Sequence, residues 1–215
     1  MTALDVYEIY PSIQGESAHA GRKCVFVRLT GCNLSCSYCD SQGAARGAGA
    51  KMDVSWIVED VRRRGIGLVE LTGGEPLLQP GAGALLTALL DRGFETLVET
   101  NGSVDIGPFD RRAKFIVDIK TPGSGAGGSF NEKNLAALTR RDEMKLVLTG
   151  RDDFDWAVAI AGEYRLPEKC AVHFSPAFGL VEPIRLAEWL LASGVDARLN
   201  LQLHKIIWGP DATGV

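Results

Sequence analysis

The chain has 215 residues, of which 46% are hydrophobic and 23% are charged, and its formal net charge is −4. These values are typical of a folded soluble protein and exclude a largely disordered chain. A negative net charge also argues against broad electrostatic binding of nucleic acid, which needs a basic surface. We therefore expect one folded domain over residues 1–215 that acts on a small molecule.

The chain shows no sign of a targeting or membrane segment. Residues 1–15 lack a cationic start followed by an apolar core, and no run of 18 apolar residues occurs. We therefore expect a cytoplasmic protein without a membrane partner. The odd count of five cysteines in that compartment argues against a disulfide framework. Cys24 and Cys170 are interpreted as buried thiols without a function.

Short apolar runs alternate with amphipathic runs along the chain, which is typical of repeated βα units around a parallel sheet. Strands are predicted at Cys24–Leu29, Leu68–Leu71, Thr96–Glu99, Phe115–Asp118, Lys145–Leu148, Ala171–Phe174 and Ala197–Leu201. Helices are predicted at Val54–Arg64, Ala82–Arg92, Asn134–Thr139, Phe154–Glu163 and Pro183–Ser193. Because a closed eightfold β/α barrel usually needs about 250 residues, we expect a shortened barrel that is open on one side.

Two stretches rich in glycine and alanine, Gly43–Ala50 and Thr121–Gly128, interrupt this pattern. Their composition predicts flexible surface loops. Long loops in compact domains are often functional, so a second interpretation is that these stretches are lids that order on ligand binding.

Three cysteines lie within eight residues directly after the first predicted strand, at Cys32, Cys36 and Cys39. Thiolates at this spacing can converge from one loop on a single centre, and a sulfur-only site indicates zinc or iron-sulfur. A structural zinc site is closed by four ligands, and a 4Fe-4S cluster is usually held by four cysteines. Three cysteines would leave one iron open to a substrate or cofactor. The alternatives are a zinc loop completed by a distant histidine and cysteines that are clustered by chance.

Four later predicted strands end in polar or glycine-rich motifs: Leu71–Pro76, Val98–Gly102, Asp118–Pro122 and Phe174–Phe178. Each motif alone is ordinary loop chemistry; the glycine pair in the first lets backbone pass close to a ligand. Because ligands of parallel α/β sheets bind beyond the carboxyl ends of the strands, we expect these motifs and the cysteine loop to surround one site.

Together these motifs resemble the radical S-adenosylmethionine (SAM) superfamily. The resemblance implies an α/β fold, namely an incomplete, open parallel β/α barrel of the radical SAM type. It implies a 4Fe-4S cluster held by Cys32, Cys36 and Cys39, whose open iron chelates SAM. It also implies that SAM is contacted by residues of the cysteine loop and of the strand ends, which are Tyr38, Cys39, Asp40, Gly74, Glu99, Asp118, Ile119, Lys120, Ser175, Pro176, Ala177 and Phe178.

The two ends of the chain carry more specific motifs. Pro11–Glu16 precedes the first predicted strand, Arg28 lies on that strand, and His204-Lys205 and Trp208–Pro210 lie near the C-terminus. With the short length, these segments resemble the 7-carboxy-7-deazaguanine synthase family. The resemblance implies conversion of 6-carboxy-5,6,7,8-tetrahydropterin to 7-carboxy-7-deazaguanine with loss of ammonia, on the route to queuosine. It further implies a homodimer and an electron donor such as flavodoxin or ferredoxin.

The resemblance also assigns roles near the substrate. It implies catalytic roles for Glu16, Arg28 and His204, and substrate-binding roles for Ile13, Gln14, Gly15, Arg28, Thr72 and Pro210. The chemistry of the residues agrees, since a guanidinium can bind a pterin carboxylate through two hydrogen bonds. The alternatives are a surface ion pair for Arg28 and a solvated loop residue for Glu16.

A Mg²⁺ site is implied at Ser41, where the family commonly has threonine; it also commonly has glycine where this chain has Ser17. The alternative for Ser41 is a hydroxyl that caps the turn after the cysteine loop. Two other functions stay open at this point. One is another radical SAM enzyme, above all an activase that installs a glycyl radical in a partner protein. The other is a non-catalytic zinc or redox protein.

Overall fold

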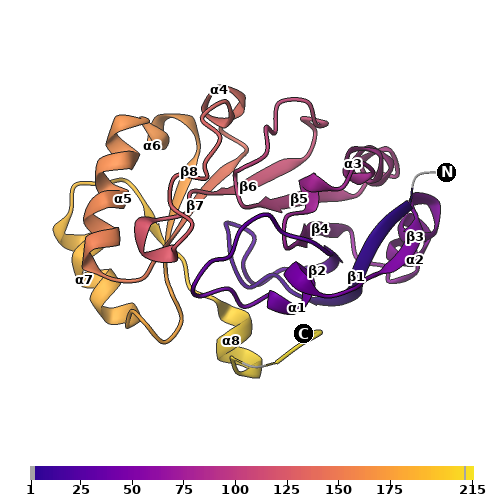
Figure 1. Ribbon diagram of the computed structural model, residues 1–215, viewed down its shortest axis with the longest axis horizontal. Coiled ribbons are helices and arrows are strands. Elements are labelled where there is room, and N and C mark those ends of the chain that lie inside the picture. The colour runs from indigo at the N-terminus through magenta and orange to yellow at the C-terminus, as the bar shows by residue number, and fades with distance from the viewer. Residues whose placement is uncertain (1–2, 211) are drawn as a thin grey trace.

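The computed structural model describes residues 3–210 and 212–215 and contains one curved sheet of nine strands (Figure 1). The strands are ordered β3-β1-β2-β4-β5-β6-β7-β8-β9. From β2 to β9 neighbouring strands are parallel, whereas β1 is antiparallel to both β2 and β3. Their bounds are β1 Ala3–Ile13, β2 Lys23–Leu29, β3 Ala50–Asp53, β4 Leu68–Gly73, β5 Glu95–Thr100, β6 Lys114–Asp118, β7 Glu143–Leu148, β8 Ala171–Pro176 and β9 Arg198–Leu199.

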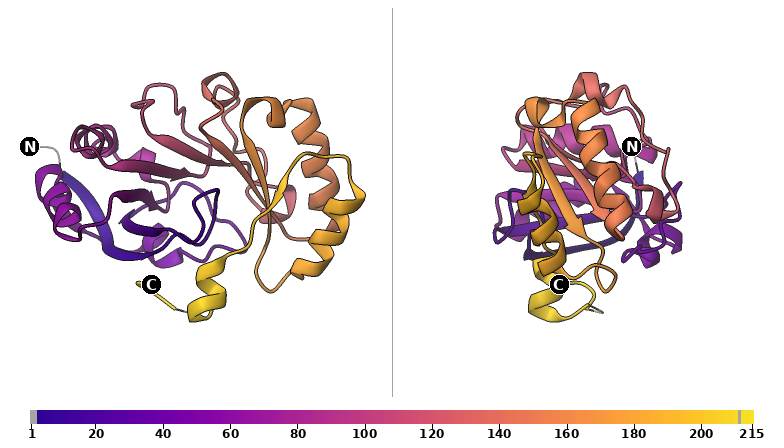
Figure 2. Two further views of the ribbon diagram at one scale, coloured as in Figure 1. Left: turned by 180° about the vertical axis from the view of Figure 1, so that it is seen from behind. Right: turned by 90° about the vertical axis from the view of Figure 1, so that its left-hand side faces the viewer.

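The longer helices lie along the outer face of this curved sheet, while α8 lies apart from them beside the C-terminus (Figures 1 and 2). Among the residues described, none of the helices combines the length and apolar character needed to cross a membrane. The helices are α1 Gln42–Arg46, α2 Val54–Arg63, α3 Ala82–Asp91, α4 Asn134–Ala137, α5 Arg151–Glu163, α6 Leu166–Lys169, α7 Pro183–Ala192 and α8 Leu203–Trp208, with 3₁₀ turns at Pro76–Leu78 and Pro122–Ser124.

The predicted open barrel is confirmed, because the strand order runs from edge β3 to edge β9 without closing. The seven predicted strands correspond to the parallel strands β2 and β4 to β9, although β9 is shorter than expected. The expectation that the segment Pro11–Glu16 only precedes the first strand is wrong, since Pro11 to Ile13 belong to β1. Proline is tolerated there because β3 pairs with β1 only at residues 3–6, so beyond them β1 is an edge strand.

The two glycine-rich stretches are not simple surface loops. Residues 43–46 of the first belong to α1, and Ala50 begins β3. In the second, Thr121 and Ser124 are completely buried. Asp153, in the first turn of α5, accepts hydrogen bonds from Thr121 Oγ1 at 2.8 Å and from the backbone N–H of Gly123 at 2.9 Å. The prediction of surface loops is therefore wrong for the helical residues of the first stretch and for Thr121 and Ser124 in the second, where the buried Asp153 carboxylate fixes the backbone. Gly125, Gly127 and Gly128 are exposed, as predicted.

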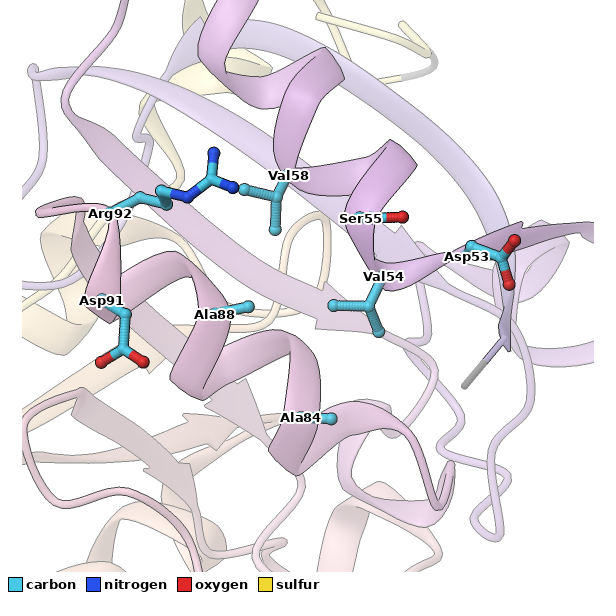
Figure 3. Close-up of a pocket in the computed structure, with 8 residues that line it drawn as sticks. All are labelled: Asp53, Val54, Ser55, Val58, Ala84, Ala88, Asp91 and Arg92. Carbon is cyan, nitrogen blue, oxygen red and sulfur yellow. The ribbon is translucent and has the colours of Figure 1, made fainter. Parts of the chain in front are cut away.

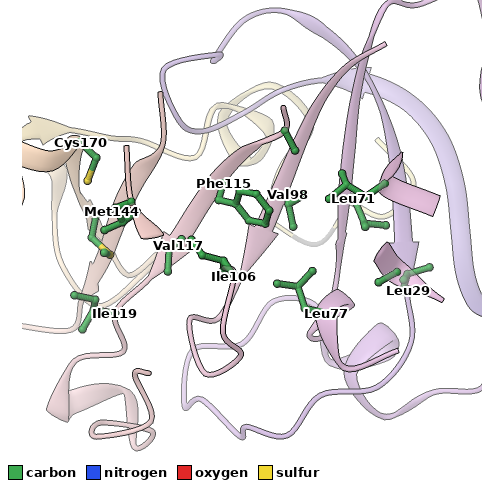
Figure 4. Close-up of a cluster of buried hydrophobic side chains, with 14 of the residues drawn as sticks. Leu29, Leu71, Leu77, Val98, Ile106, Phe115, Val117, Ile119, Met144 and Cys170 are labelled. Atoms are coloured by element: carbon green, nitrogen blue, oxygen red, sulfur yellow. The ribbon is translucent and has the colours of Figure 1, made fainter. Parts of the chain in front are cut away.

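Strand alternation divides the side chains into two layers. Outward-facing residues such as Leu71, Val98 and Val117 form the large core beneath the helices (Figure 4). Inward-facing Phe26, Leu97 and Ile116 belong to a smaller apolar cluster inside the barrel. Cys24 and Cys170 are 0% and 3% exposed, which confirms that both are buried thiols.

Toward the carboxyl ends of the strands the inward positions change from apolar to charged. Two residues after Phe26, Leu97 and Ile116 come Arg28, Glu99 and Asp118. Because the strands are parallel, these charges meet at one edge of the sheet. The fold therefore places a polar site above an apolar floor.

Candidate active site

Lys145 on β7 is the centre of the polar site. Its Nζ donates a hydrogen bond to Glu16 Oε2 at 2.7 Å, contacts the Glu99 carboxylate, and lies 3.9 Å from Asp118 Oδ1. Only 6% of the Lys145 side chain is exposed. Burial alone would favour the neutral amine, but Asp118, Glu16 and Glu99 together raise the pKa of Lys145 well above its usual value. Burial likewise opposes the charge of Glu99, yet Lys145 lowers its pKa. Lys145 and Glu99 thus form a buried ion pair at the centre of the site.

The two ends of the chain meet at this network. The carbonyl oxygen of Gly15 accepts a hydrogen bond from the backbone N–H of Leu203 at 2.9 Å. A Cβ on Gly15 would lie 2.3 Å from His204 Nδ1, so only glycine allows this contact. Gln202 Nε2 donates to Glu16 Oε1 at 2.7 Å. The N-terminal and C-terminal segments predicted to bind substrate are therefore adjacent in space.

The C-terminal segment also contacts the cysteine loop. Asp40 Oδ2 accepts hydrogen bonds from Lys205 Nζ at 2.8 Å and from Gln202 Nε2 at 3.1 Å. Although partial burial works against the charged form, these two groups lower the pKa of Asp40 to about 2. Lys205 Nζ also lies 5.3 Å from the centre of the Phe178 ring, and Phe178 is half exposed. Helix α8 thus connects the cysteine loop with the end of β8.

Arg28 is held by two residues of the antiparallel strand β1. Its Nε donates to Glu8 Oε1 at 3.0 Å, and its Nη2 donates to Tyr10 Oη at 2.8 Å. These contacts use two of the five guanidinium N–H donors. The side chain is 20% exposed, so the ion pair with Glu8 is a mostly buried one rather than the surface pair considered as an alternative. Thr72 is opposite Arg28 on β4.

The cysteine loop lies against the ends of several strands. A Cβ on Gly74 would lie 2.4 Å from the carbonyl oxygen of Gly31 and 2.7 Å from Cys32 Cβ, so the turn after β4 packs directly on this loop. Ser37 is hydrogen-bonded to the backbone of Ser124 and Gly123, in the second glycine-rich stretch. Cys32, Cys36 and Cys39 are free and partly exposed. Within the described part of the chain, no three His, Cys, Asp or Glu side chains are gathered closely enough to hold a metal.

Most residues predicted to contact SAM lie near these strand ends. Lys120 Nζ donates to Asp118 Oδ2 at 2.7 Å and lies 5.9 Å from the centre of the Tyr38 ring. Ser175 Oγ accepts a hydrogen bond from Asn200. Asp118 Oδ1 and Tyr38 Oη are buried, and no hydrogen-bond partner reaches either atom from the described residues. Two orphaned polar atoms beside the cysteine loop fit a polar cofactor that supplies the missing partners.

The chain matches the family model of the Radical SAM superfamily over residues 26–124, which include the cysteine loop. It is 42% identical to 7-carboxy-7-deazaguanine synthase from Koribacter versatilis, over 99% of this chain and 100% of the relative. It is 43% identical to 7-carboxy-7-deazaguanine synthase from Chlorobaculum tepidum, over 99% of this chain and 97% of the relative. The chain belongs to the 7-carboxy-7-deazaguanine synthase family.

The fold of this synthase-family chain agrees with the crystal structure of QueE from Escherichia coli, with a TM-score of 0.74 and 20% identity. The match covers 93% of this chain and 94% of that one. The predicted family is confirmed, and membership of a radical SAM family implies a 4Fe-4S cluster and SAM. The zinc or redox protein considered from the sequence is therefore excluded.

Several predicted site residues of this family member lie less centrally. Ile13 and Trp208 line a small groove of about 290 Å³ on the side of β1. Pro210 is exposed, and no hydrogen bond from it to another predicted substrate residue occurs within residues 3–210. The side chain of Ile119 is buried in the outer core, so only its backbone can face a cofactor. A larger groove of about 450 Å³ between α2 and α3 contains none of the predicted site residues (Figure 3).

Sequence reasoning missed four residues that contact the predicted site residues: Tyr10, Glu70, Lys145 and Gln202. A signal existed for two of them, because Glu70 and Lys145 are charged residues inside otherwise apolar strands, and such residues are rarely buried without a partner. Tyr10 lies in a strand that was not predicted. Gln202 carried no sequence signal, because its role depends on the approach of Glu16, 186 positions away.

Glu70 gives a pH-dependent prediction. Gln14 Nε2 donates a hydrogen bond to its carboxyl group, which is 1% exposed. Burial, and then the charge of Glu99, raise the pKa of Glu70 well above 4.5. An acid with a raised pKa in the folded state stabilises the protein below its unfolded pKa, and this stabilisation is lost as the pH rises through the folded pKa.

Glu70→Gln keeps an oxygen acceptor that does not titrate. We expect this variant to gain thermal stability relative to the wild type as the pH is raised from about 5 to about 9. Thermal unfolding across that range measures the difference, with Glu163→Gln on the exposed end of α5 as the control. Parallel curves for Glu70→Gln and the wild type would show that Glu70 is already ionised.

Proposed function

We propose that the protein converts 6-carboxy-5,6,7,8-tetrahydropterin to 7-carboxy-7-deazaguanine with release of ammonia, in the queuosine pathway. The observation that carries the proposal is the meeting of the two chain ends at Glu16, where Lys145 and Gln202 bind separate carboxylate oxygens. The chain is 42% and 43% identical to two synthases of that name over 99% of its length, which supports the same reaction. Largely buried polar side chains from distant segments fit a small substrate better than a protein partner, which an activase would need.

The roles of the residues follow from their chemistry. Arg28 would bind the substrate carboxylate with the guanidinium donors that Glu8 and Tyr10 leave unused. Glu16, only 15% exposed, would accept hydrogen bonds from the pyrimidine edge through its remaining lone pairs, since a carboxylate has about four. This burial argues against a solvated loop residue. His204, beside Gly15, would cover the substrate from the C-terminal side. Ile13, Gln14, Gly15, Thr72 and Pro210 would complete the substrate contacts.

Cys32, Cys36 and Cys39 would hold the cluster, drawn together from one loop when it binds. When bound, the cluster and SAM supply the radical chemistry. Asp118 and Tyr38, whose Oδ1 and Oη receive no hydrogen bond from the described residues, would contact SAM. The other SAM contacts would come from Asp40, Gly74, Glu99, Ile119, Lys120 and Ser175 to Phe178. Because the cysteine loop is partly exposed, a flavodoxin or ferredoxin could approach the cluster.

The reaction itself is the test of this function. Anaerobically reconstituted protein, supplied with SAM and a reductant, should convert 6-carboxytetrahydropterin to a product with the mass and absorption of 7-carboxy-7-deazaguanine, with one ammonia released per product. A protein that binds SAM and cleaves it, but leaves the pterin unchanged, would belong to another radical SAM reaction.

We further propose one cytoplasmic domain over residues 1–215 that acts as a homodimer. A single continuous sheet supports one domain. Exposed Ile184 and Leu191 on α7, which are 66% and 88% exposed, provide apolar surface that a second copy could cover. Light scattering on the holoenzyme would give the molar mass.

Arg28→Lys should weaken substrate binding and little else. Lysine keeps the charge but loses the planar arrangement of donors, and losing one charge-assisted hydrogen bond costs about 1.5 to 3 kcal/mol. The substrate Kd should therefore rise about 10- to 100-fold. Calorimetry with substrate and with SAM separates the two ligands, and iron content serves as the control. A SAM affinity that falls as far as the substrate affinity would contradict the assignment of Arg28.

We propose that Ser41 contributes to a Mg²⁺ site completed by substrate oxygens and water. Ser41 occupies the N-cap position of α1, but its side chain makes no capping hydrogen bond, which leaves the hydroxyl available to a metal. Mg²⁺ should raise the activity of chelator-treated enzyme, and Ser41→Ala should lower the response about 10-fold or more. Ser41→Thr restores the family's usual residue and should retain the response. Equal activity with and without Mg²⁺ would remove the metal from the proposal.

A further inference from the structure

One buried ammonium serves two parts of the site that are far apart in the sequence. Lys145 contacts Glu16, which is 129 positions away on the loop between β1 and β2, and Glu99, which is 46 positions away on β5. Glu16 belongs to the proposed substrate-binding segment and Glu99 to the proposed SAM-binding strand end. Among the described residues, these two segments share no helix or strand. Lys145 contacts both of them.

We propose that Lys145 is a positioning residue that fixes the substrate-binding loop and the SAM-binding strand end relative to each other. The proposal rests on the proposed function for the identity of the two ligands. Lys145 acts through Glu16 and Glu99 and is not itself required to touch a ligand.

The contacts around Glu16 support positioning. Its Oε2 is bound by Lys145 and its Oε1 by Gln202, so both carboxylate oxygens are held and the group cannot rotate freely. The backbone N–H of Glu16 donates to Gln14 Oε1 at 2.9 Å, which fixes the chain at the same point. A carboxylate fixed in this way keeps its remaining lone pairs oriented for the hydrogen bonds that Glu16 is proposed to accept from the substrate.

The charges also favour positioning over simple stabilisation. Lys145 faces three carboxylates, those of Glu16, Glu99 and Asp118, and is 6% exposed. Buried ion pairs of this kind often stabilise a fold no better than apolar residues of similar volume. They do define geometry, because removal of one partner leaves the others charged, buried and unpaired. The second ammonium, Lys120, is 2.7 Å from Asp118, and no salt bridge from it to Glu16 or Glu99 occurs among the residues described.

Two double-mutant cycles on the cluster-loaded holoenzyme test the proposal. The first measures the SAM Kd by calorimetry for Lys145→Met, Glu99→Gln and the double variant, and needs no pterin. The second measures kcat/KM for 6-carboxytetrahydropterin in Lys145→Met, Glu16→Gln and the double variant. We expect Lys145→Met to lower kcat/KM about 100-fold. In each cycle the double variant should be no more impaired, in SAM Kd or in kcat/KM, than the more impaired of its two single variants, because the residues act as one unit. Iron content should be unchanged throughout.

Single-variant losses that multiply in either double variant would overturn the proposal, as would wild-type values in Lys145→Met. Lys145→Arg keeps the buried charge and so covers the case in which Lys145→Met does not fold. The planar guanidinium of Lys145→Arg is larger than the ammonium and cannot occupy the same point between Glu16 and Glu99. The kcat/KM of this variant should therefore fall about 10-fold, with unchanged iron content. Wild-type kcat/KM in Lys145→Arg would also overturn the proposal. A wild-type protein that binds SAM but does not convert the pterin would refute the proposed function, whereas the SAM cycle would still decide the role of Lys145.

Discussion

Replacing Cys32, Cys36 or Cys39 by alanine, one at a time, should abolish both the cluster and the activity. Three thiolates are fewer than the usual four for such a cluster, so none can be spared. The loop contacts the turn after β4 and the backbone of Ser124, and neither contact involves a thiol, so the folded barrel should persist. Iron content and visible absorption after anaerobic reconstitution measure the effect, and circular dichroism measures the fold.

Cys24→Ala and Cys170→Ala are the matched controls. Burial raises the pKa of both thiols, that of Cys170 to about 12, so neither is a ready thiolate ligand. Each substitution should cost about 1 kcal/mol in stability and leave iron content unchanged. Undiminished iron in any one of the three loop variants, or lost iron in a control that is still folded, would refute this ligand set.

A chain that ends after Leu203 should retain its cluster and convert no substrate. The truncation removes His204, which lies against Gly15, and Lys205, which is paired with Asp40. The helix α8 therefore contacts both the cysteine loop and the loop proposed to bind substrate. Loss of several such contacts, each worth about 1 kcal/mol or more, should reduce kcat/KM by at least about 100-fold. Turnover and iron content are measured on the same samples.

Gly15→Ala tests the same closure without shortening the chain. The added Cβ would lie 2.3 Å from His204 Nδ1 and 3.0 Å from the backbone nitrogen of His204, so α8 must shift. Gly162→Ala on α5, where no atom lies within 4 Å of the added carbon, is the control and should behave as the wild type. If the truncated chain turned over substrate normally, α8 would be structural, and Gly15→Ala should then also be active.

The parallel part of the fold could be predicted from local sequence. Strands such as β4 and β6 are short apolar runs, and their ends carry glycines or carboxylates that mark the ligand edge. The antiparallel strand β1 could not be predicted in the same way. It contains Pro11 and several polar residues, and it is a strand because β2 pairs with its residues 6–13 and β3 with its residues 3–6. Pairing with a partner strand is a tertiary property that a single segment does not encode.

The residues of the candidate site likewise fall into those that the sequence predicted and those that only the tertiary structure revealed. The spacing of Cys32, Cys36 and Cys39 already predicted a zinc or iron-sulfur loop, because ligands that are close in sequence can meet without help from the fold. The resemblance to the radical SAM superfamily then indicated an iron-sulfur cluster. The partners of Lys145 and Gln202 were decided by the tertiary structure alone. They depend on which strands are neighbours and on which loop enters the barrel, and the residues they join are 129 and 186 positions apart. The sequence therefore determined where the cofactors are expected, and the folded barrel determined which charges hold the loop of Glu16, proposed to bind substrate, beside them.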